Sequence, residues 1–478
     1  MFMKTNMLKR ILAAGLVGVM MLSLCSCGGK EETTEEKVVI EPMEEETVHT
    51  LGFDFIGGTD VMPIGGYYGP AASFEAGNGR KAPDHYTDEF FSKIADSGVN
   101  LLLYPNADYE GAKDYVIKEL ELAEKYKLGM YIYDAKFCEL ATDEGMTLED
   151  MDARLAEYCD YPAFCGVYVV DEPQPSWADK AYDHKKTTRF ADTYQKLRQL
   201  GVVGSSNLGP QKSGNDGDYA QYEKYVEEYM TLCNPQYLCY DYYVWDGDTS
   251  IEGYFRNTSI IRKAAEKYEV PWWSFIQAGG QWNDAGALFD SAKLYPDEGQ
   301  FNWNVSTALA MGAKGISYFP LIQPWKFSWS LTEEFDFQRN GLIGAYGNKT
   351  QWWYYAQDVN EHIRAVDSVL MNAVNKGVIV TGKQAKTDTK YFEFLMEEDS
   401  WRELASVDGN AMIGCFNYKG KTALYVANYE YKYAQKITLN LHDTYNMNVT
   451  QNADTTNVKT DKLVLDLTAG EGALVVFE

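Results

Sequence analysis

The sequence is poor in residues that bind metals and in residues that bind phosphate. It has five histidines in 478 residues and no His-Glu-x-x-His motif, so we expect neither a transition-metal site nor a cofactor. Lysine and arginine together number 43, against 70 aspartates and glutamates, which gives a formal net charge of −27. Such a surface repels phosphate backbones, so nucleic acid is not an expected partner.

Cysteine is present, but not with the spacing of a redox or zinc site. No two of the eight cysteines are separated by two residues, which is the spacing that such sites use most often. Cys159 with Cys165, and Cys233 with Cys239, are close enough in sequence to pair as disulfides outside the cell. Buried free thiols are the alternative interpretation.

The N-terminal segment has the features of an export signal. Basic residues at positions 4, 9 and 10 precede a short apolar run, 11–24, which ends in small residues. Leu24, Ser26 and Cys27 resemble a bacterial lipobox, with Cys25 as a second candidate for the lipidated cysteine. We expect residues 1–26 to be a lipoprotein signal peptide and Cys27 to carry the lipid. The protein would then be an exported bacterial lipoprotein on the outer face of the cell membrane; a soluble secreted protein is the alternative.

A glutamate-rich stretch follows this signal. Residues 30–50 read KEETTEEKVVIEPMEEETVHT and have little to bury. We expect residues 27–50 to form a solvated acidic tether.

Strand-like and helix-like segments alternate along the middle of the chain. Short runs of β-branched and aromatic residues predict strands at 61–68, 99–104, 129–134, 166–171, 202–206, 237–243, 272–277 and 315–320. Apolar residues three and four positions apart predict intervening helices, among them 115–126, 148–158, 188–200, 219–230 and 251–268. Eight such units predict a (β/α)8 barrel over residues 51–372. No glycine-rich phosphate loop follows the first strand, which argues against a nucleotide-binding fold.

The pattern changes in the last part of the chain. Short, often alternating apolar runs occur at 377–381, 411–417, 422–428, 436–441, 463–466 and 473–477, with no helical period between them. We therefore predict a small all-β sandwich over residues 373–478.

Acids, amides and aromatic residues recur where the predicted barrel strands end. In a (β/α)8 barrel the chemistry lies at the carboxyl ends of the strands, so these residues are the candidates for a site that binds polyols. The candidates for substrate binding are Asn106, Asp171, Asn207, Tyr242, Trp245, Gln277, Trp282, Gln323 and Trp325. Core packing is the alternative role for each tryptophan. Capping of its strand is the alternative role for Gln277.

Four segments resemble known enzymes. GVYVVDEPQPSW, at 166–177, resembles the fourth-strand motif of clan A glycoside hydrolases, in which the glutamate after the strand is the general acid/base. GAKGISYFPLIQPW, at 312–325, resembles the last barrel strand of glycoside hydrolase family 42 β-galactosidases. MPIGGYYGP and DSGVNLLLYPN resemble the first two strands of their broader relatives. The resemblance covers roughly residues 50–370, and the terminal sandwich resembles the accessory domains of these enzymes. It implies a carbohydrate substrate, and Glu172 as the acid.

The chain departs from that family at its seventh strand. There the family has a glutamate nucleophile, whereas residues 271–280 of this chain contain no carboxylate. Asp171 also replaces the asparagine that precedes the family's acid. An amide such as Gln277 does not readily form the glycosyl ester of a retaining mechanism.

A second carboxylate must therefore come from elsewhere if the protein cleaves glycosidic bonds. Asp241 is the first candidate and Asp134 the second, with structural hydrogen bonding as the alternative for both. A separation of about 6.5–9.5 Å from Glu172 would favour an inverting mechanism. In extended geometry Asp171 would point to the other side of the strand from Glu172.

The sequence is compatible with two functions. The first is a surface-anchored glycoside hydrolase that acts on oligo- or polysaccharides. The second is a non-catalytic glycan-binding lipoprotein on a degenerate glycosidase barrel. A solute-binding lipoprotein is disfavoured, because it would have two α/β lobes and no β-only end.

Overall fold

The structure is a computed structural model. It describes residues 40–41, 43–73, 83–103, 112–134, 147–173, 184–245, 247, 249–279, 295–323 and 340–478. Residues Ile40–Glu478 form one compact unit.

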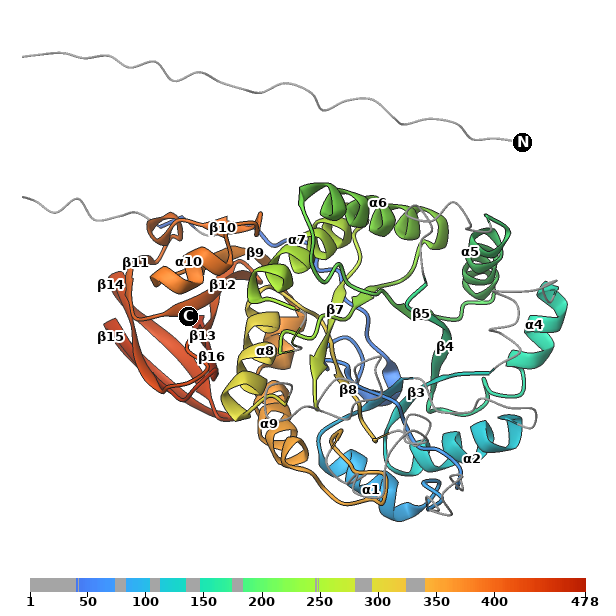
Figure 1. Ribbon diagram of the computed structural model, residues 1–478. Helices are drawn as coiled ribbons and strands as arrows, with labels where there is room; N and C mark the ends of the chain where they lie inside the picture. Colours follow the sequence, from blue (N-terminus) through green and yellow to red (C-terminus); the bar gives the residue numbers. More distant parts are fainter. Residues whose placement is uncertain are drawn as a thin grey trace, which may run out of the picture. The chain divides into compact units, whose positions relative to one another are not determined.

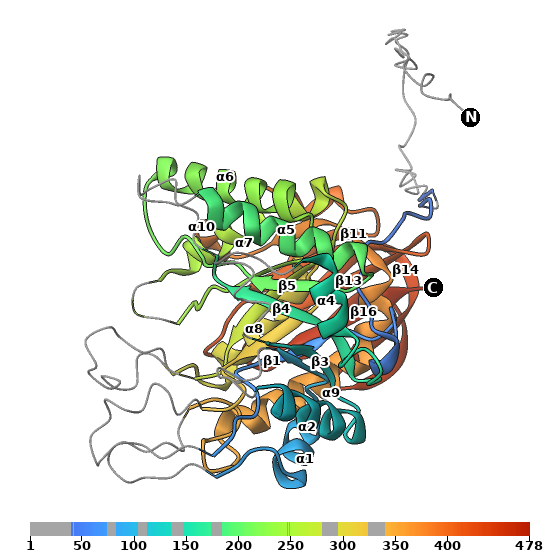
Figure 2. The ribbon, with the colours of Figure 1, turned by 90° about the vertical axis from the view of Figure 1, so that its right-hand side faces the viewer.

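Eight parallel strands form a closed barrel (Figures 1 and 2). They are β1 Ile64–Tyr67, β2 Leu101–Leu103, β3 Gly129–Ile132, β4 Phe164–Asp171, β5 Gly204–Asn207, β6 Leu238–Tyr240, β7 Trp272–Gln277 and β8 Ile316–Phe319. The hydrogen-bonded order runs β5-β4-β3-β2-β1-β8-β7-β6. A parallel bridge between Leu208 and Tyr240 closes the remaining gap between β5 and β6.

The strands are buried on both faces, as parallel strands in a barrel must be. In β2, Leu101 and Leu103 join an aromatic cluster inside the barrel. Leu102 faces the surrounding helices and belongs to the larger outer core. Because both faces of such a strand are covered, its sequence is a continuous apolar run. It does not alternate between apolar and polar residues.

Helices surround the barrel and follow its strands. They are α1 Asp88–Asp96, α2 Ala112–Lys125, α4 Leu148–Leu155, α5 His184–Gln199, α6 Asp216–Cys233, α7 Ile251–Lys267, α8 Glu298–Ala310 and α9 Gln351–Met371. Local sequence fixes several of their starts. At α8, Asp297 accepts from the Gln300 amide at 2.8 Å, and the Gln300 side chain accepts from the Asp297 amide at 2.9 Å, which is a capping box. Among the described helices, none combines the length and the apolar composition needed to cross a membrane.

The C-terminal part is a β domain. Its strands are β9 Ala373–Val380, β10 Leu395–Met396, β11 Leu404–Asp408, β12 Ala411–Tyr418, β13 Lys421–Asn428, β14 Gln435–Gln451, β15 Asp454–Leu467 and β16 Gly472–Phe477. They form one connected sheet, in which β14 pairs with β11, β15 and β16. Residues from nearly all of these strands join a single core, so the sheet wraps around it.

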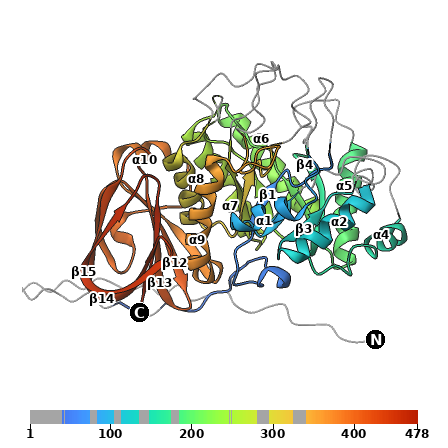
Figure 3. The same cartoon turned by 90° about the horizontal axis from the view of Figure 1, so that it is seen from below.

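The β domain packs against the barrel through α8 (Figure 3), which contacts β12, β13 and β16. Met412, Phe416 and Tyr425 belong to the outer core of the barrel, whereas Ile413 and Leu424 belong to the core of the β domain. The two faces of this sheet therefore serve two different cores.

The predicted fold class, a (β/α)8 barrel followed by a C-terminal β domain, is confirmed. Two local expectations were wrong. The β domain contains a short helix, α10 Lys383–Asp388, where no helix was predicted. Residues 43–50 do not behave as a solvated tether: Glu46 pairs with Lys376 at 2.7 Å, and the Asn417 amide donates to the Glu44 carbonyl at 2.6 Å.

Candidate active site

Three neighbouring strands bring the candidate acids together. The Glu172 amide after β4 donates to the carbonyl of Asn207, the last residue of β5, at 2.9 Å. The Asp241 amide after β6 donates to the carbonyl of Leu208 at 3.2 Å. Because these ladder bonds align the strand ends, Glu172, Asn207 and Asp241 meet at the carboxyl end of the barrel.

The backbone at Glu172 is left-handed. Its φ is 39°, a value that non-glycine residues rarely adopt and that costs about 1–3 kcal/mol. Regular alternation therefore stops at this residue, so the extended geometry in which Asp171 and Glu172 would point to opposite sides does not persist here. Both interact with Asp241. Such strain occurs mostly at functional sites, where the surrounding structure holds it in place.

Glu172 and Asp241 form a pair of neighbouring carboxyl groups, close enough for each to shift the pKa of the other. Burial raises the pKa of Glu172, as does the charge of Asp171, while Asp241 and Lys212 lower it. Burial, followed by the charges of Glu172 and Asp171, raises the pKa of Asp241 well above its usual range. Two adjacent carboxyls in a buried site cannot readily both ionise, so the pair retains a proton to higher pH than either acid would alone.

Two oxygen atoms in this group lack a partner. Asp241 is 4% exposed and Asn207 is 3% exposed. Within the described part of the chain, Oδ1 of each is buried without a hydrogen-bond donor. A buried acceptor without a donor costs about 1–3 kcal/mol, so both atoms are suited to receive hydroxyl groups from a ligand or water.

Asp171 lies at the open end of the barrel and retains solvent access. The Tyr168 hydroxyl donates to it at 2.8 Å. Removal of its carboxyl group from water raises the pKa of Asp171, while hydrogen bonds from Tyr67, Tyr168 and Asn207 lower it. Asp171 is thus the acid with the most hydrogen-bond support for its ionised form.

Aromatic rings line the barrel beside the acids. Phe319 lies 5.1 Å from Tyr243 and 5.5 Å from Tyr68, measured between ring centroids. Tyr67 lies 5.7 Å from Tyr168 and 5.5 Å from Phe275. Rings of this kind offer an apolar surface to the C–H face of a sugar.

The interior position after Asp241 belongs to Tyr243 rather than to the predicted Tyr242. Tyr243 joins the interior cluster and lies close enough to Asp241 for each to shift the pKa of the other. The Tyr242 hydroxyl instead donates to the Ser250 carbonyl at 3.0 Å and accepts from the Ser250 amide at 3.1 Å, at the start of α7. Strand alternation was the signal that would have selected Tyr243, because residues two apart share a face.

Asp134, the second candidate for the second carboxylate, is held by helix α4. It is 1% exposed, and it accepts from Arg154 Nε at 2.6 Å and from the Tyr158 hydroxyl at 2.8 Å. These bonds orient Asp134 toward the helix, and it is not among the groups that shift the pKa of Glu172.

Gln277 and Gln323 bind backbone groups after β7 and β8. The Gln277 side-chain oxygen accepts from the Trp245 amide at 3.1 Å, and its nitrogen donates to the Gly279 carbonyl at 3.0 Å. The Gln323 oxygen accepts from the Asn340 amide at 3.0 Å. The Trp245 ring lies 4.8 Å from Tyr431 of the β domain, which places it between the two domains.

Four predicted residues lie outside the described part of the chain: Asn106, Trp282, Trp325 and the lipidation candidate Cys27. Among the residues that are described, no three His, Cys, Asp or Glu side chains are placed to hold a metal. Five cysteines are described, and all are free thiols.

No protein-family model matches the chain, and no curated protein matches it. Solved structures that resemble it are glycoside hydrolases. A catalytic mutant of a family 42 β-galactosidase from G. stearothermophilus has 10% identity over 91% of this chain and 99% of its own, with a TM-score of 0.49. A putative α-galactosidase from Bacteroides fragilis has 11% identity over 88% and 80%, with a TM-score of 0.46. A β-galactosidase from the psychrophilic Marinomonas ef1 has 11% identity over 66% of this chain, with a TM-score of 0.44; the chain covers 63% of it, less than two thirds.

Proposed function

We propose that the protein is a glycoside hydrolase in which Glu172 donates the proton to the leaving oxygen. The pair of half-buried Glu172 and buried Asp241 at the carboxyl end of the barrel carries this proposal. A general acid must still hold its proton near neutral pH, and burial together with the negative charge of Asp171 raises the pKa of Glu172 in that direction. The unpartnered oxygens of Asp241 and Asn207 would receive sugar hydroxyls.

The other two acids have different roles in this proposal. Asp241 lies close enough to Glu172 for each to shift the pKa of the other, so in this proposal it does not lie across the gap that holds the sugar ring. It would share the proton of the pair with Glu172 and orient that acid, which makes it a positioning residue. Asp171 would remain ionised and act on the sugar or on the attacking water, supported by the Tyr168 hydroxyl.

The test is hydrolysis of a broad panel of oligosaccharides by the chain from Ile40 onward, with products followed by NMR. We expect cleavage by the wild type and a loss of about 10²–10⁴-fold in Glu172→Gln. The loss should be much smaller on aryl glycosides whose leaving group needs no proton. Equal losses on both substrate types would show that Glu172 is not the acid. The anomer released first distinguishes retention from inversion.

A non-catalytic glycan-binding protein is the second candidate, and one observation favours it. The carboxyl end of β7 holds Gln277, and both ends of its amide bind backbone groups, so β7 supplies no carboxylate. Under this alternative some oligosaccharides bind, none is cleaved, and Glu172→Gln changes only affinity.

We also propose that the chain is exported and lipidated at Cys27, on the strength of the basic start, the apolar run and the small residues before that cysteine. Mass spectrometry of the membrane fraction should find a diacylglyceryl group on Cys27 and no residues 1–26. An unmodified Cys27→Ala protein in the medium is the expected control, and membrane retention of that variant would contradict the proposal.

A further inference from the structure

The backbone that follows β5 is in contact with the candidate acid. A Cβ placed on Gly209 would lie 3.4 Å from both Cδ and Oε1 of Glu172, so the carboxyl group packs against the chain at this glycine. Because glycine has no side chain, the carboxyl can approach the backbone closely there. The position of this backbone therefore affects the position of the Glu172 carboxyl.

The same segment, residues 209–212, brings a cation to the acid. Lys212 is exposed to solvent, and its charge lowers the pKa of Glu172, against the effects of burial and of Asp171. Water and salt weaken such an interaction as the distance grows, so an exposed cation acts on its neighbour only while its segment is held in place. Both the contact at Gly209 and the charge of Lys212 thus depend on what fixes segment 209–212.

Asn257 of α7 fixes this segment. Its Oδ1 accepts from the Gln211 amide at 2.9 Å, and its Nδ2 donates to the Gln211 carbonyl at 2.9 Å. Nδ2 also donates to the Gly253 carbonyl at 2.8 Å, one turn earlier in the helix. A side-chain carboxamide has the acceptor and the donors of a peptide group, so Asn257 pairs with both backbone groups of Gln211 as a neighbouring strand would.

Burial makes these bonds hard to replace. Asn257 is 0% exposed, so water does not take the place of a lost partner, and a broken bond leaves a buried amide unsatisfied. Asparagine is also a weak helix former, so α7 itself gives no reason for an asparagine in its middle. The bonds to segment 209–212 supply that reason.

We propose that Asn257 is a positioning residue for the Glu172 carboxyl, which it holds through the segment from Gly209 to Lys212. Its part in catalysis rests on the proposed function, because it acts there on the general acid. Loss of its bonds to Gln211 would release both the support at Gly209 and the charge of Lys212. An asparagine with a structural role alone would affect the stability of the fold and leave the ionisation of Glu172 unchanged.

The direction of the expected change follows from the groups around Glu172. The described titratable groups that act on it or respond to its charge are Asp171 of β4, Lys212 after β5, Tyr222 of α6, and Asp241 and Tyr243 after β6. Lys212 is the one cation among these described groups. If it moves away, the pKa of Glu172 rises. The acid then keeps its proton to higher pH, so the alkaline limb of kcat/KM should move to higher pH.

The test measures the ionisation of Glu172 directly, by carbon NMR of the chain from Ile40 onward, labelled at the carboxyl carbon of its glutamates. The Glu172 signal is the one that is absent from Glu172→Gln. We expect Asn257→Ala to raise the pH midpoint of this signal by about 0.3–1, and Lys212→Met to raise it by a similar amount. Lys212→Arg keeps the charge and should keep the wild-type midpoint.

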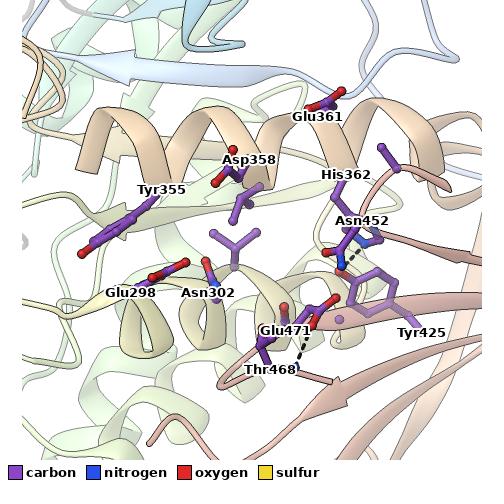
Figure 4. A pocket seen from close by; sticks show the side chains of 15 residues that line it. Glu298, Asn302, Tyr355, Asp358, Glu361, His362, Tyr425, Asn452, Thr468 and Glu471 are labelled. Atoms are coloured by element: carbon purple, nitrogen blue, oxygen red, sulfur yellow. Dashed lines mark hydrogen bonds between the residues drawn. The ribbon is translucent and has the colours of Figure 1, made fainter. Parts of the chain in front are cut away.

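The matched control is Asn360→Ala on α9, the helix that carries His362 in Figure 4. Asn360 is 1% exposed, and it also has bonds on both sides of its amide: Oδ1 accepts from the Tyr318 hydroxyl at 2.6 Å, and Nδ2 donates to the Ser97 carbonyl at 2.8 Å. Its loss should lower stability to a similar extent without moving the Glu172 midpoint.

A smaller change is available if Asn257→Ala folds poorly. In Asn257→Ser the hydroxyl can bond the Gly253 carbonyl, as the Thr258 hydroxyl bonds the Tyr254 carbonyl at 2.8 Å, but it does not reach Gln211. This variant should also raise the Glu172 midpoint.

The activity assay separates this inference from the proposed function. On any oligosaccharide that the wild type cleaves, the alkaline limb of kcat/KM should move together with the NMR midpoint in each variant. If the wild type cleaves nothing, the proposed function fails, and the NMR midpoint still decides the role of Asn257. An unmoved midpoint in the Asn257 variants, or an equal movement in Asn360→Ala, would overturn that role.

Discussion

At the residue scale, the site depends on carboxyls held in an unfavourable environment. Asp241 is almost fully buried and lies next to Glu172, with Asp171 also close enough to raise its pKa. A raised folded-state pKa means that stability is lost as the pH rises through it. The site should therefore reduce the stability of the fold near neutral pH, as functional sites commonly do.

The first prediction concerns Asp241→Asn, which replaces the buried acid by a neutral group of the same shape. We expect its free energy of unfolding to exceed that of the wild type by about 1–2 kcal/mol at pH 7. The difference should shrink toward about pH 3, where the wild-type acid is largely protonated in both states. Denaturant unfolding at the two pH values measures this. A variant less stable than the wild type at pH 7 would show that the Asp241 charge is stabilising.

The second prediction compares two adjacent tyrosines. Tyr243→Phe removes a hydroxyl that lowers the pKa of Asp241, and it should shift the pH profile of activity by changing the acid pair. Tyr242→Phe removes the bonds at the start of α7 and should lower stability by about 1–2 kcal/mol without moving that profile. Kinetics against pH and thermal unfolding separate the two effects. The same shift of the profile in both variants would contradict the assignment of faces.

At the element scale, side chains after the strands tie neighbouring units together. Gln277 joins the end of β7 to the segment after β6 through the Trp245 amide. Gln277 is 1% exposed, so loss of its side-chain amide leaves the Trp245 amide and the Gly279 carbonyl without this partner. We expect Gln277→Ala to lower the free energy of unfolding by about 1–3 kcal/mol. Gln277→Glu is the matched control: it keeps an acceptor for Trp245 but loses the donor to Gly279. Unchanged stability in Gln277→Ala would leave ligand binding as the role of this residue.

The elements themselves were largely predictable, because each barrel strand is a short apolar run and each helix has a regular period. All eight predicted barrel strands overlap observed ones, and Gly166–Asp171 falls within β4. The orientation of Glu172 was not predictable, since it depends on a left-handed backbone that the sequence pattern does not encode. The roles of Asp134 and Tyr242 depend on α4 and α7, which pack against them only in the folded chain. The sequence of residues 43–50 is typical of a solvated tether. Their contacts are to strands more than 300 residues away in the sequence, so the local pattern does not reveal them.

At the scale of the whole molecule, two buried histidines connect stability to pH. Burial lowers the pKa of His85 to about 4, and that of His362 to about 4. The His85 ring bonds the Ala345 carbonyl and stacks on Phe90. Both rings are therefore neutral in the folded chain, whereas the unfolded chain takes up their protons below about pH 6.5.

The fourth prediction follows from this linkage. The unfolded state binds more protons between about pH 6.5 and 4, so the histidines make the free energy of unfolding fall as the pH falls through that window. The carboxyls at the barrel mouth make the free energy of unfolding rise as the pH falls, which opposes the effect of the histidines. The effect of one histidine is therefore measured as the difference between the wild type and a variant that lacks it. His85→Asn should be less stable than the wild type at pH 7, by an amount that decreases by up to about 1.4 kcal/mol per pH unit toward pH 4. Parallel pH curves for the two proteins would show that His85 does not titrate in this range.

The last prediction concerns where the folded unit begins. Asn417 is 5% exposed, and its amide donates to the Glu44 carbonyl at 2.6 Å and to the Glu46 carboxylate at 2.9 Å. A chain that starts at residue 51 leaves this buried amide without either acceptor. A chain that starts at Ile40 keeps both. We expect the shorter chain to be less stable by about 1–3 kcal/mol, of which the partly exposed Glu46–Lys376 ion pair contributes at most about 1 kcal/mol.

The control for this comparison is Lys376→Gln in the chain from Ile40, which removes the ion pair but keeps the bonds to Asn417. If most of the loss comes from the buried amide, Lys376→Gln should stay close to the wild type in denaturant unfolding. Equal stability of the two truncated chains would show that residues 40–50 lie on the β domain without stabilising it. Because β9 and β12 receive these contacts and also pack next to α8, removal of residues 40–50 should loosen the β domain before the barrel. Hydrogen exchange resolved by segment would detect that order, and faster exchange in the barrel first would contradict it.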